Sequence, residues 1–535
     1  MISQPHTAPS VAIVGAGPGG LSAAVILAAR GCRVTVFESR SEIGGRTGRE
    51  TLDTEQGSFA IDRGPTFFLM PYVLDEVFRV AGKRMADEVE MTRLDPMYRL
   101  VLGRSEQPDS PITLDATQDI AEMARRVGEI APADGKAFPE FIEANRYKLR
   151  HSESILRNPM RSPLDLFGKQ TLTDTLKVAP ILRPHMTVQD LLNKYFKHPQ
   201  IQRAVGFQSK YLGMSPRDCP SLFTILPFIE YEYGVWHPKG GCHAIMQALA
   251  RVAGECGADI RTSTPVEQIT FRGSSSKATG VVVDGEQHEF DHVVVNADAT
   301  WALKTLVPDA VRAQAGKEYA TETIDTKRYS CSTFMLYLAV DGELDLPHHT
   351  IYVSADYDNN LKDITLNHKL TEDCSFYVCN ASTTDPTMAP PGKSSVYVLV
   401  PTPNMRAPEG TTELDWQASL DQLRDRTYAQ MSRILGLSDL RSRVIAERVY
   451  TPQDWAAHNI NHGATFNLAH NLKQMLHWRP QNRLKGFDNL WLVGGGTHPG
   501  SGLPTIFLSA QITSRMLCDE AGVKTNAPAT EAAMV

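Results

Sequence analysis

The sequence predicts an α/β fold in which a nucleotide-binding domain is joined by a strand-rich domain and a helical cap. Three observations lead to this prediction. An apolar strand, a glycine-rich turn and a helical pattern follow one another from Val11, β-branched runs fill residues 332–403, and helical patterns with proline breaks occupy residues 72–235. A chain of 535 residues is long enough for two or three such domains.

A glycine-rich turn follows the first predicted strand, residues 11–14. It matches the pattern G-x-G-x-x-G and consists of Gly15, Ala16, Gly17, Pro18, Gly19 and Gly20. Gly15 permits the tight turn, Gly17 lets the backbone approach a pyrophosphate, and Gly20 lets the next helix pack close to the strand. The first amides of that predicted helix, residues 19–29, then point at phosphate groups.

An acidic residue ends the second predicted strand, residues 33–38. Glu38 lies 23 positions after Gly15, where a carboxylate bonds the hydroxyl pair of a ribose, and we place Ser39 in the same site. A carboxylate here would repel the 2′-phosphate of NADP. Strand, turn, helix, strand and acid thus occur in the order that a dinucleotide-binding domain requires.

A glycine pair and an arginine follow soon after the acid, as Gly44, Gly45 and Arg46. The glycines can bring backbone close to a second phosphate or ribose, and the guanidinium supplies a fixed positive fork. This segment resembles the GG-doublet flavoproteins, which include amine oxidases, carotenoid desaturases and prenyl-binding GDP-dissociation inhibitors. The resemblance implies a Rossmann-like FAD-binding domain rather than a nicotinamide site.

A second glycine-rich crossing lies near the C-terminus. An apolar strand at residues 490–493 is followed by a loop with five glycines and by a predicted helix at residues 505–517. Close backbone approach and a free helix N-terminus are again expected there. We place five residues of this crossing in the cofactor site: Gly495, Gly496, Gly502, Leu503 and Pro504.

Several ordered motifs make the resemblance more specific. They are residues 296–298, 329–332, 348–351, 385–390, 479–480 and 494–504. Together they resemble the bacterial and fungal type phytoene desaturases and their C30 relatives. The resemblance implies non-covalent FAD and an extended isoprenoid or carotenoid substrate. It also implies that Pro65 and Thr66 pass beside the flavin ring, that the Val266 backbone meets the adenine, and that Asn296 lies below the cofactor.

The expected domains are discontinuous. Residues 8–71, 236–300 and 451–520 form the FAD-binding domain, residues 72–235 a helical cap, and residues 301–450 a strand-rich substrate domain with a sheet as its floor. We expect the tail, residues 521–535, to be disordered.

The cap carries an unusual charge. Between Arg146 and Arg217, thirteen Lys or Arg stand against four Asp or Glu, a local charge of +9 in a chain whose net charge is −7. Apolar residues such as Leu164 and Phe167 are interleaved with them. Cations and apolar side chains together are what a peripheral membrane contact requires, although a solvated cap would carry similar charges.

Other function classes are not favoured by the composition. The small net charge argues against nucleic acid as the main partner. Eight Cys without a C-x-x-C pair indicate neither a zinc framework nor a disulfide scaffold, so we expect a cytoplasmic protein without a metal. Because of the basic, partly apolar cap, we expect it to be peripherally membrane-associated. Adjacent strand residues face opposite sides, so we interpret His348 and His349 as structural or surface residues rather than metal ligands.

The chemistry implied by the resemblance needs few acid–base groups. Forming a double bond from CH₂–CH₂ removes a hydride and a proton, and flavin can accept the hydride. We assign no catalytic side chain; Arg99 and His498 are polar candidates, more typical of cofactor or backbone partners. A second dinucleotide motif is not apparent, so a quinone or oxygen would reoxidise the flavin. A carotenoid oxidase, ketolase or isomerase, or a prenyl carrier without enzymatic activity, remain alternatives.

Overall fold

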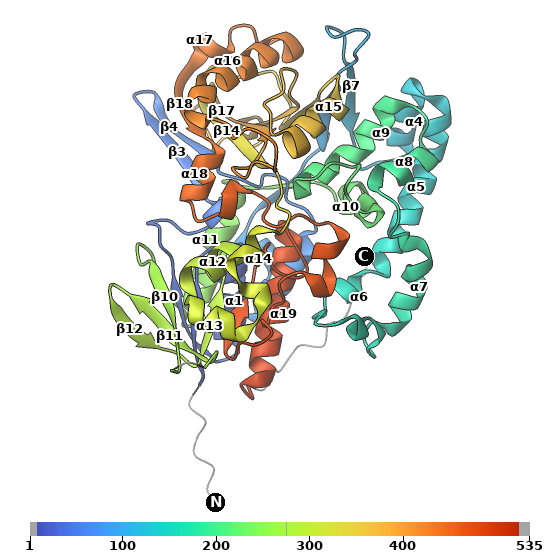
Figure 1. The fold of residues 1–535 in the computed structure, drawn as a ribbon. Coiled ribbons are helices and arrows are strands. Elements are labelled where there is room, and N and C mark those ends of the chain that lie inside the picture. The colour runs from blue at the N-terminus through green and yellow to red at the C-terminus, as the bar shows by residue number, and fades with distance from the viewer. Residues whose placement is uncertain (1–7, 274, 524–535) are drawn as a thin grey trace, which may run out of the picture.

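A parallel sheet of five strands forms the base of the molecule, in the lower half of Figure 1. The computed structural model describes residues 8–273 and 275–523. All neighbouring strands of this sheet pair in parallel. Their order is β19 (Leu490–Leu492), β13 (His292–Val295), β1 (Ser10–Val14), β2 (Arg33–Phe37) and β9 (Asp259–Arg261). The sheet therefore joins the three chain segments that the sequence assigns to the FAD-binding domain.

One face of this sheet is covered by helices that pack around α1 (Pro18–Ala29). Its neighbours are α2 (Pro71–Val80), α11 (Cys242–Glu255) and α19 (Leu503–Glu520). Ten of the twelve residues of α1 are buried, and most of them are small, so the three neighbours can approach it closely. The predicted strand–turn–helix–strand unit is confirmed in order and length.

The other face carries a small antiparallel sheet and three helices. The sheet contains β10 (Val266–Phe271), β11 (Ala278–Val283) and β12 (Glu286–Glu289), and the helices are α12 (Ala299–Leu306), α13 (Asp309–Ala315) and α14 (Thr321–Asp325). Leu303, Val311 and Ile324 of these helices share a core with Val14 and Val293 of the parallel sheet. The segment after residue 300, which we expected to begin the substrate domain, therefore packs on the FAD-binding domain.

A sheet of seven strands forms the upper part of the molecule in Figure 1. Its order is β18 (Val444–Tyr450), β14 (Ser332–Asp341), β17 (Lys393–Thr402), β16 (Phe376–Asn380), β15 (His349–Val353), β6 (Tyr98–Leu102) and β7 (Ile112–Ala116). Alternate residues of β14 face opposite sides: Leu336 packs under α16 (Trp416–Leu435), and Tyr337 packs toward the hairpin of β3 (Arg49–Thr54) and β4 (Gly57–Asp62).

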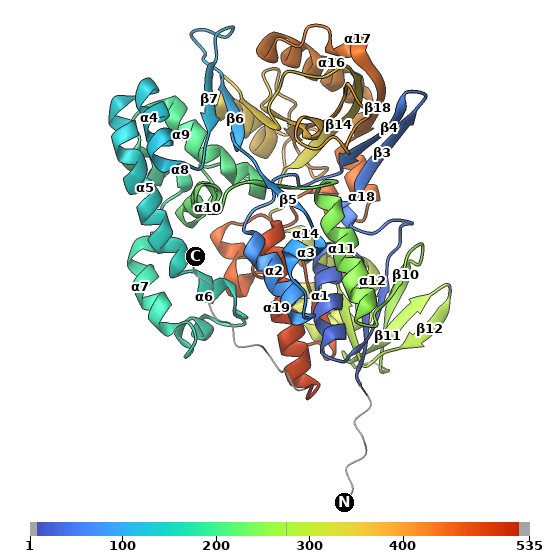
Figure 2. The same ribbon diagram turned by 180° about the vertical axis from the view of Figure 1, so that it is seen from behind.

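The cap is a set of helices beside this sheet, seen from both sides in Figures 1 and 2. It contains α4 (Ile120–Ile130), α5 (Pro132–Arg150), α6 (Glu153–Leu156), α7 (Leu172–Leu182), α8 (Val188–Tyr195), α9 (Pro199–Gly206), the short helix η3 (Phe207–Leu212) and α10 (Ile225–Tyr233). The remaining short elements are α3 (Met85–Glu88), β5 (Met91–Arg93), β8 (Trp236–Pro238), α15 (Tyr357–Lys362), α17 (Leu440–Arg443) and α18 (Pro452–Ala457). None of the described helices is both long and apolar enough to cross a membrane.

The start of the cap differs from the sequence prediction. Residues 72–235 are not helical throughout, because β6 and β7 extend the large sheet through parallel pairing of β6 with β15. The preceding helix α2 packs mainly on α1 and α19, and its contacts with the cap are made by Tyr72 and Glu76. β6 joins the large sheet by pairing with β15, more than two hundred residues later in the chain. A local sequence pattern does not indicate such a distant pairing. Most of the expected disordered tail, residues 524–535, lies outside the described residues.

A buried charge network ties the hairpin to the large sheet. Glu50 on β3 is 1% exposed and accepts hydrogen bonds from Arg63, from Arg448 of β18 and from the Tyr450 hydroxyl, the last at 2.9 Å. Burial alone would raise the pKa of the Glu50 carboxyl, but the hydrogen bond and charge of Arg63, assisted by Arg448 and Tyr450, leave it lowered. The ionised carboxylate is thus the form that the fold stabilises.

Replacing Glu50 should destabilise the protein strongly. We expect Glu50→Ala to cost about 3–5 kcal/mol in the free energy of unfolding, because the buried Arg63 would lose its buried carboxylate partner. The exposed Glu42, which also contacts Arg63 at 3.5 Å, is the matched control, and Glu42→Ala should cost about 1 kcal/mol or less. Urea denaturation measures both; equal losses would contradict this account.

The same network should make stability depend on acid pH. Because the folded-state pKa of Glu50 is lowered, its contribution is fully present above the unfolded pKa of about 4.3 and is lost as the pH falls below it. Glu50→Gln should therefore flatten the decline of unfolding free energy below about pH 4. Parallel curves for wild type and variant would contradict the prediction.

Candidate active site

Three backbone segments meet around Asn296, just beyond β13. Asn296 Nδ2 donates to the carbonyl of Gly15 at 3.0 Å, and its own amide donates to the Val14 carbonyl at 2.8 Å. A Cβ atom on Gly19 would lie 2.6 Å from Asn296 Oδ1 and 3.3 Å from the Cα of Gly494. A Cβ atom on Gly20 would lie 2.1 Å from the Gly15 carbonyl oxygen. Only glycine fits at these points, as the sequence predicted for the helix–strand contact.

The carboxylate of Glu38 lies beside the glycine-rich turn. Glu38 is 6% exposed, and its oxygens accept hydrogen bonds from the amides of Ala16 at 2.8 Å and Arg40 at 3.0 Å. Glu38, Ser39 and Arg40 line one end of the main cavity. This is where the sequence places the ribose of a dinucleotide.

Two arginines, the buried Arg479 and the half-buried Arg46, hold the loops around the C-terminal crossing. Arg479 is 1% exposed and donates to the carbonyls of Gly495 at 2.7 Å and Thr497 at 3.1 Å, and burial lowers its pKa to about 10. Arg46 lines the cavity and donates to the carbonyl of Thr465 and the side chain of Asn467. Part of the Arg46 guanidinium, which we expected to face the cofactor, therefore binds residues 465–467.

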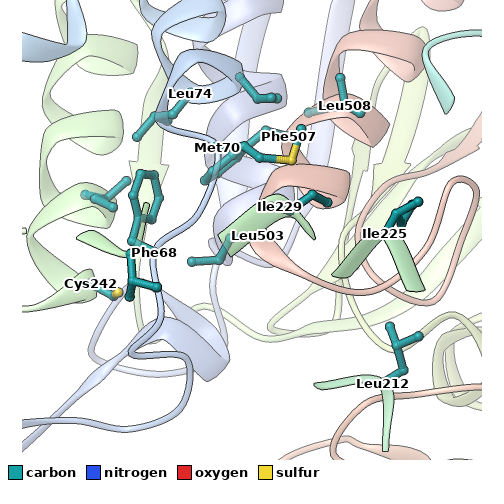
Figure 3. Close-up of a cluster of buried hydrophobic side chains, with 14 of the residues drawn as sticks. Phe68, Met70, Leu74, Leu212, Ile225, Ile229, Cys242, Leu503, Phe507 and Leu508 are labelled. Atoms are coloured by element: carbon teal, nitrogen blue, oxygen red, sulfur yellow. The ribbon is translucent and has the colours of Figure 1, made fainter. Parts of the chain in front are cut away.

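One cavity connects these features with the large sheet and the cap. Its volume is about 470 Å³, within the range of about 300–1,000 Å³ that is usual for ligand sites. The end near Glu38 is bounded by glycine backbone and charged side chains, and the other end by apolar and aromatic side chains. Figure 3 shows part of the apolar packing at its edge, where Ile225 and Ile229 of the cap belong to one cluster with Met70 and Leu503 of the base.

Most of the predicted site residues line this cavity. They are Gly15, Gly17, Pro18, Glu38, Ser39, Gly45, Arg46, Pro65, Thr66, Asn296, Gly495, Gly502, Leu503 and Pro504. Ala16, Gly19, Gly20 and Gly44 contribute to the same turns without lining the cavity, and neither Gly496 nor Val266 lines it. Arg99 is paired with Asp115 on the neighbouring strand, and His498 faces the Asn158 carbonyl, so both polar candidates lie outside the lining.

The cap contributes lining residues that the sequence did not indicate. Phe207, Lys210, Tyr211 and Leu212 come from η3, and Ile229 comes from α10. In residues 205–212 apolar and aromatic side chains alternate with Gln208, Ser209 and Lys210, a pattern equally typical of a partly buried helix. The neighbouring Phe67 also lines the cavity, directly after the predicted Thr66.

Our interpretation of His348 and His349 was wrong in its geometry. β15 begins at His349, so strand alternation does not apply to His348, and the two rings lie 4.4 Å apart in the interior. A nitrogen of each and the sulfur of Cys379 lie within 4.8 Å of one another. Burial lowers the pKa of both histidines well below its usual value and raises that of Cys379 to about 12. The three groups are therefore neutral imidazoles and a protonated thiol.

His349 connects this cluster to the cavity wall. Its Nδ1 lies 2.7 Å from the hydroxyl of Tyr377, which also lies 2.7 Å from the Thr66 hydroxyl. The Phe67 ring stacks on His349 with 4.1 Å between ring centres. Thr66 and Phe67 are thus fixed by packing, which gives the cavity wall a defined shape next to the predicted flavin position.

The glycine contacts, the carboxylate of Glu38 and the free N-terminus of α1 fit a dinucleotide cofactor. The backbone can approach a pyrophosphate at Gly17, since this residue lines the cavity and has no Cβ. Cys518, the cysteine that follows the C-terminal crossing in the sequence, lies inside α19, fully buried and outside the cavity lining. The glycine-rich turn and Glu38 can thus hold a dinucleotide without a covalent bond.

Comparison with known proteins identifies relatives along almost the whole chain. The family model described as flavin containing amine oxidoreductase matches residues 18–518. A 4,4′-diapophytoene desaturase (4,4′-diapolycopene-forming) from Methylomonas sp is 41% identical over 96% of both chains. An all-trans-zeta-carotene desaturase from Myxococcus xanthus is 37% identical over 98% of this chain and 96% of its own. An oxidoreductase structure from Methanosarcina mazei has a TM-score of 0.61 at 18% identity, covering 95% and 100% of the two chains, which shows a shared fold.

Adding one methyl group at Gly20 should impair flavin binding. In Gly20→Ala the new Cβ collides with the Gly15 carbonyl, so α1 must move away from the turn that meets the pyrophosphate. We expect FAD affinity to fall at least tenfold, about 1.4 kcal/mol, measured by flavin fluorescence on dilution. Gly254→Ala, on α11 with open space around the new atom, is the control and should keep its flavin. Full flavin retention in Gly20→Ala would refute the assigned geometry.

Proposed function

The chain belongs to the flavin containing amine oxidoreductase family, and within it to the carotenoid desaturases of the phytoene desaturase type, and on this premise we propose that it introduces double bonds into a linear carotenoid precursor. It is an FAD-dependent oxidoreductase that acts on CH–CH bonds. The substrate that we favour is diapophytoene (C30), with phytoene (C40) as the alternative, because the 41% identical relative is named for diapophytoene.

One observation carries the proposal: a single cavity runs from the glycine-rich turn and Glu38 to an apolar wall of aromatic side chains. A carotenoid precursor has no polar handle, so shape and apolar contact must align it. Phe67, Tyr211 and Tyr377 belong to that wall and help to exclude water from the reacting carbons. A carrier of prenyl groups would not need the nucleotide end of the cavity.

The cofactor contacts follow from residues already described. The turn Gly15–Gly20 and the N-terminus of α1 would hold the pyrophosphate, and Glu38 the ribose. When bound, FAD supplies a two-electron acceptor for a hydride. The chain itself must then hold the saturated C–C bond close to the flavin, between the wall at Thr66 and the glycine crossing at Gly502. A quinone or oxygen would reoxidise the flavin.

A spectroscopic assay tests the proposed reaction. Purified holoprotein is added to liposomes containing diapophytoene or phytoene, under nitrogen with a quinone or under air without it. New structured bands in the visible region are expected because each added double bond lengthens the conjugated system. The preferred substrate decides between C30 and C40, and the two gas conditions decide the acceptor. Bound flavin without any new band on either substrate would exclude a desaturase and favour an oxidase or isomerase of coloured carotenoids.

We also propose that the outer end of the cap touches a membrane surface. Four large apolar side chains are exposed there: Leu164 (77%), Phe167 (59%), Leu172 (39%) and Leu176 (62%). This apolar patch lies on and just before α7, at the outer edge of the molecule in Figures 1 and 2. Exposed basic residues surround it in sequence, namely Arg161, Lys169, Lys177 and Arg183. Apolar groups with flanking cations support contact with anionic lipid and delivery of an insoluble substrate.

Liposome sedimentation tests this contact. Replacing Leu164, Phe167 and Leu176 together by Ser should weaken binding to anionic vesicles at least tenfold, since their apolar area no longer enters the interface. Leu366→Ser is the control, because Leu366 is 57% exposed but lies in the substrate domain. Salt should weaken wild-type binding as well. Equal binding of all three proteins would contradict the membrane role of the patch.

A further inference from the structure

A buried carboxyl group stands directly behind the cap wall of the cavity. Glu230, on α10, is 0% exposed, and the preceding residue Ile229 lines the cavity. Its Oε2 accepts hydrogen bonds from the Tyr98 hydroxyl at 2.8 Å and from Gln208 Nε2 at 3.0 Å. Three elements, β6, η3 and α10, thus converge on one carboxyl.

The second carboxyl oxygen has Tyr211, a residue of the cavity wall, as a neighbour. Glu230 Oε1 and the Tyr211 hydroxyl are both buried without a hydrogen-bond partner among the described residues, and they lie close enough for the hydroxyl to lower the pKa of the carboxyl. The Tyr211 ring belongs to the cavity wall and packs 5.5 Å from Phe67, the residue that follows Thr66. Tyr211 is therefore the wall residue whose hydroxyl can link the carboxyl to the cavity near the predicted flavin position.

Within the described residues, Glu230 has no cationic partner. The charged groups that α5 presents to α10 are engaged elsewhere: Arg146 pairs with Glu232 at 2.8 Å, and Lys148 binds Thr224 at 2.7 Å. Tyr231 is the other titratable neighbour. Lys210, next to Tyr211, lines the cavity and has its pKa lowered by burial. An unpaired buried carboxyl is costly, which favours a functional role.

We propose that Tyr211 and Glu230 form the proton-accepting pair of the reaction, with Glu230 acting through the Tyr211 hydroxyl. This inference rests on the proposed desaturation. One C–H bond of the substrate gives a hydride, with its electron pair, to the bound two-electron acceptor. The adjacent C–H bond gives its electron pair to the new C=C bond and its proton to the Tyr211 oxygen, while Tyr211 passes its own proton to the Glu230 carboxylate.

Two physical effects favour this pair. Loss of hydride leaves a delocalised cation in an apolar cavity, and a nearby carboxylate stabilises it because the low dielectric screens little. Burial raises the pKa of Glu230 to about 7, while the bonds from Gln208, Tyr211 and Tyr98 oppose this shift. A carboxylate with that pKa is a better base than an ordinary Glu and is still ionised in a large fraction of molecules near neutral pH.

The test compares pH profiles of product formation by holoenzyme variants. The wild-type rate should rise with pH to a plateau above about pH 7, because only the ionised carboxylate accepts the proton. Glu230→Gln keeps the shape of the side chain and should lower the plateau about 10²–10⁴-fold and remove the pH dependence. Tyr211→Phe should lose a similar factor, and the double variant little more than either alone.

Tyr98→Phe separates proton transfer from a structural role. It removes a hydrogen bond that favours the ionised carboxyl but does not interrupt the path to the cavity. We expect the pH midpoint to rise with little change in the plateau, whereas a merely structural role would not move the midpoint. Flavin content and thermal unfolding are measured for each variant, and if Glu230→Gln does not fold, Tyr211→Phe carries the test.

The outcomes distinguish the two proposals. If wild type converts the precursor and Glu230→Gln or Tyr211→Phe does so at the same rate with the same pH profile, the proton-accepting pair is refuted while the desaturase function stands. If the wild-type holoenzyme converts neither precursor, the proposed function fails and the pair fails with it. A loss of pH dependence in both variants supports the pair.

Discussion

The contact of three backbone segments around Asn296 is the constraint on which the rest of the structure depends. A Cβ atom on Gly19 would lie 2.6 Å from Asn296 Oδ1, and one on Gly20 would lie 2.1 Å from the Gly15 carbonyl oxygen. Because only hydrogen fits, the loops after β1, β13 and β19 meet at one edge of the parallel sheet. That meeting places the first amides of α1 and the crossing before α19 at the same cavity.

The cavity then acquires two chemically different ends from two different parts of the fold. Glycine backbone and Glu38 bound the end at the parallel sheet, where a nucleotide needs close approach and a carboxylate. The seven-stranded sheet and the cap supply most of the apolar end, including Tyr377 of β16 and Tyr211 of η3. An oxidoreductase for a substrate without polar groups needs this division, since the cofactor is bound by hydrogen bonds and the substrate by shape.

The buried charged groups of this protein differ in whether their bonding partners explain why they are buried. Arg479 uses its guanidinium to hold the carbonyls of the C-terminal crossing, so its burial has a structural explanation. Glu50 is matched by two arginines. Glu230 has hydroxyl and amide donors but no cation among the described residues, and it lies behind the cavity wall. This difference is why a functional role is assigned to Glu230 and not to the other two.

The nucleotide-binding half could be predicted from the sequence, because the requirements there are local. The turn Gly15–Gly20 needs residues without side chains, and alternation or apolar runs mark β1, β2, β14 and β19. The assembly of the substrate half, by contrast, depends on tertiary contacts. Tyr98 and Glu230 are 132 positions apart, and pairing with distant strands set the start of β15 at His349 and brought β6 into the large sheet. Contacts between segments so far apart leave no periodic signal in either segment, so the wall around Tyr211 became visible only once the chain was folded.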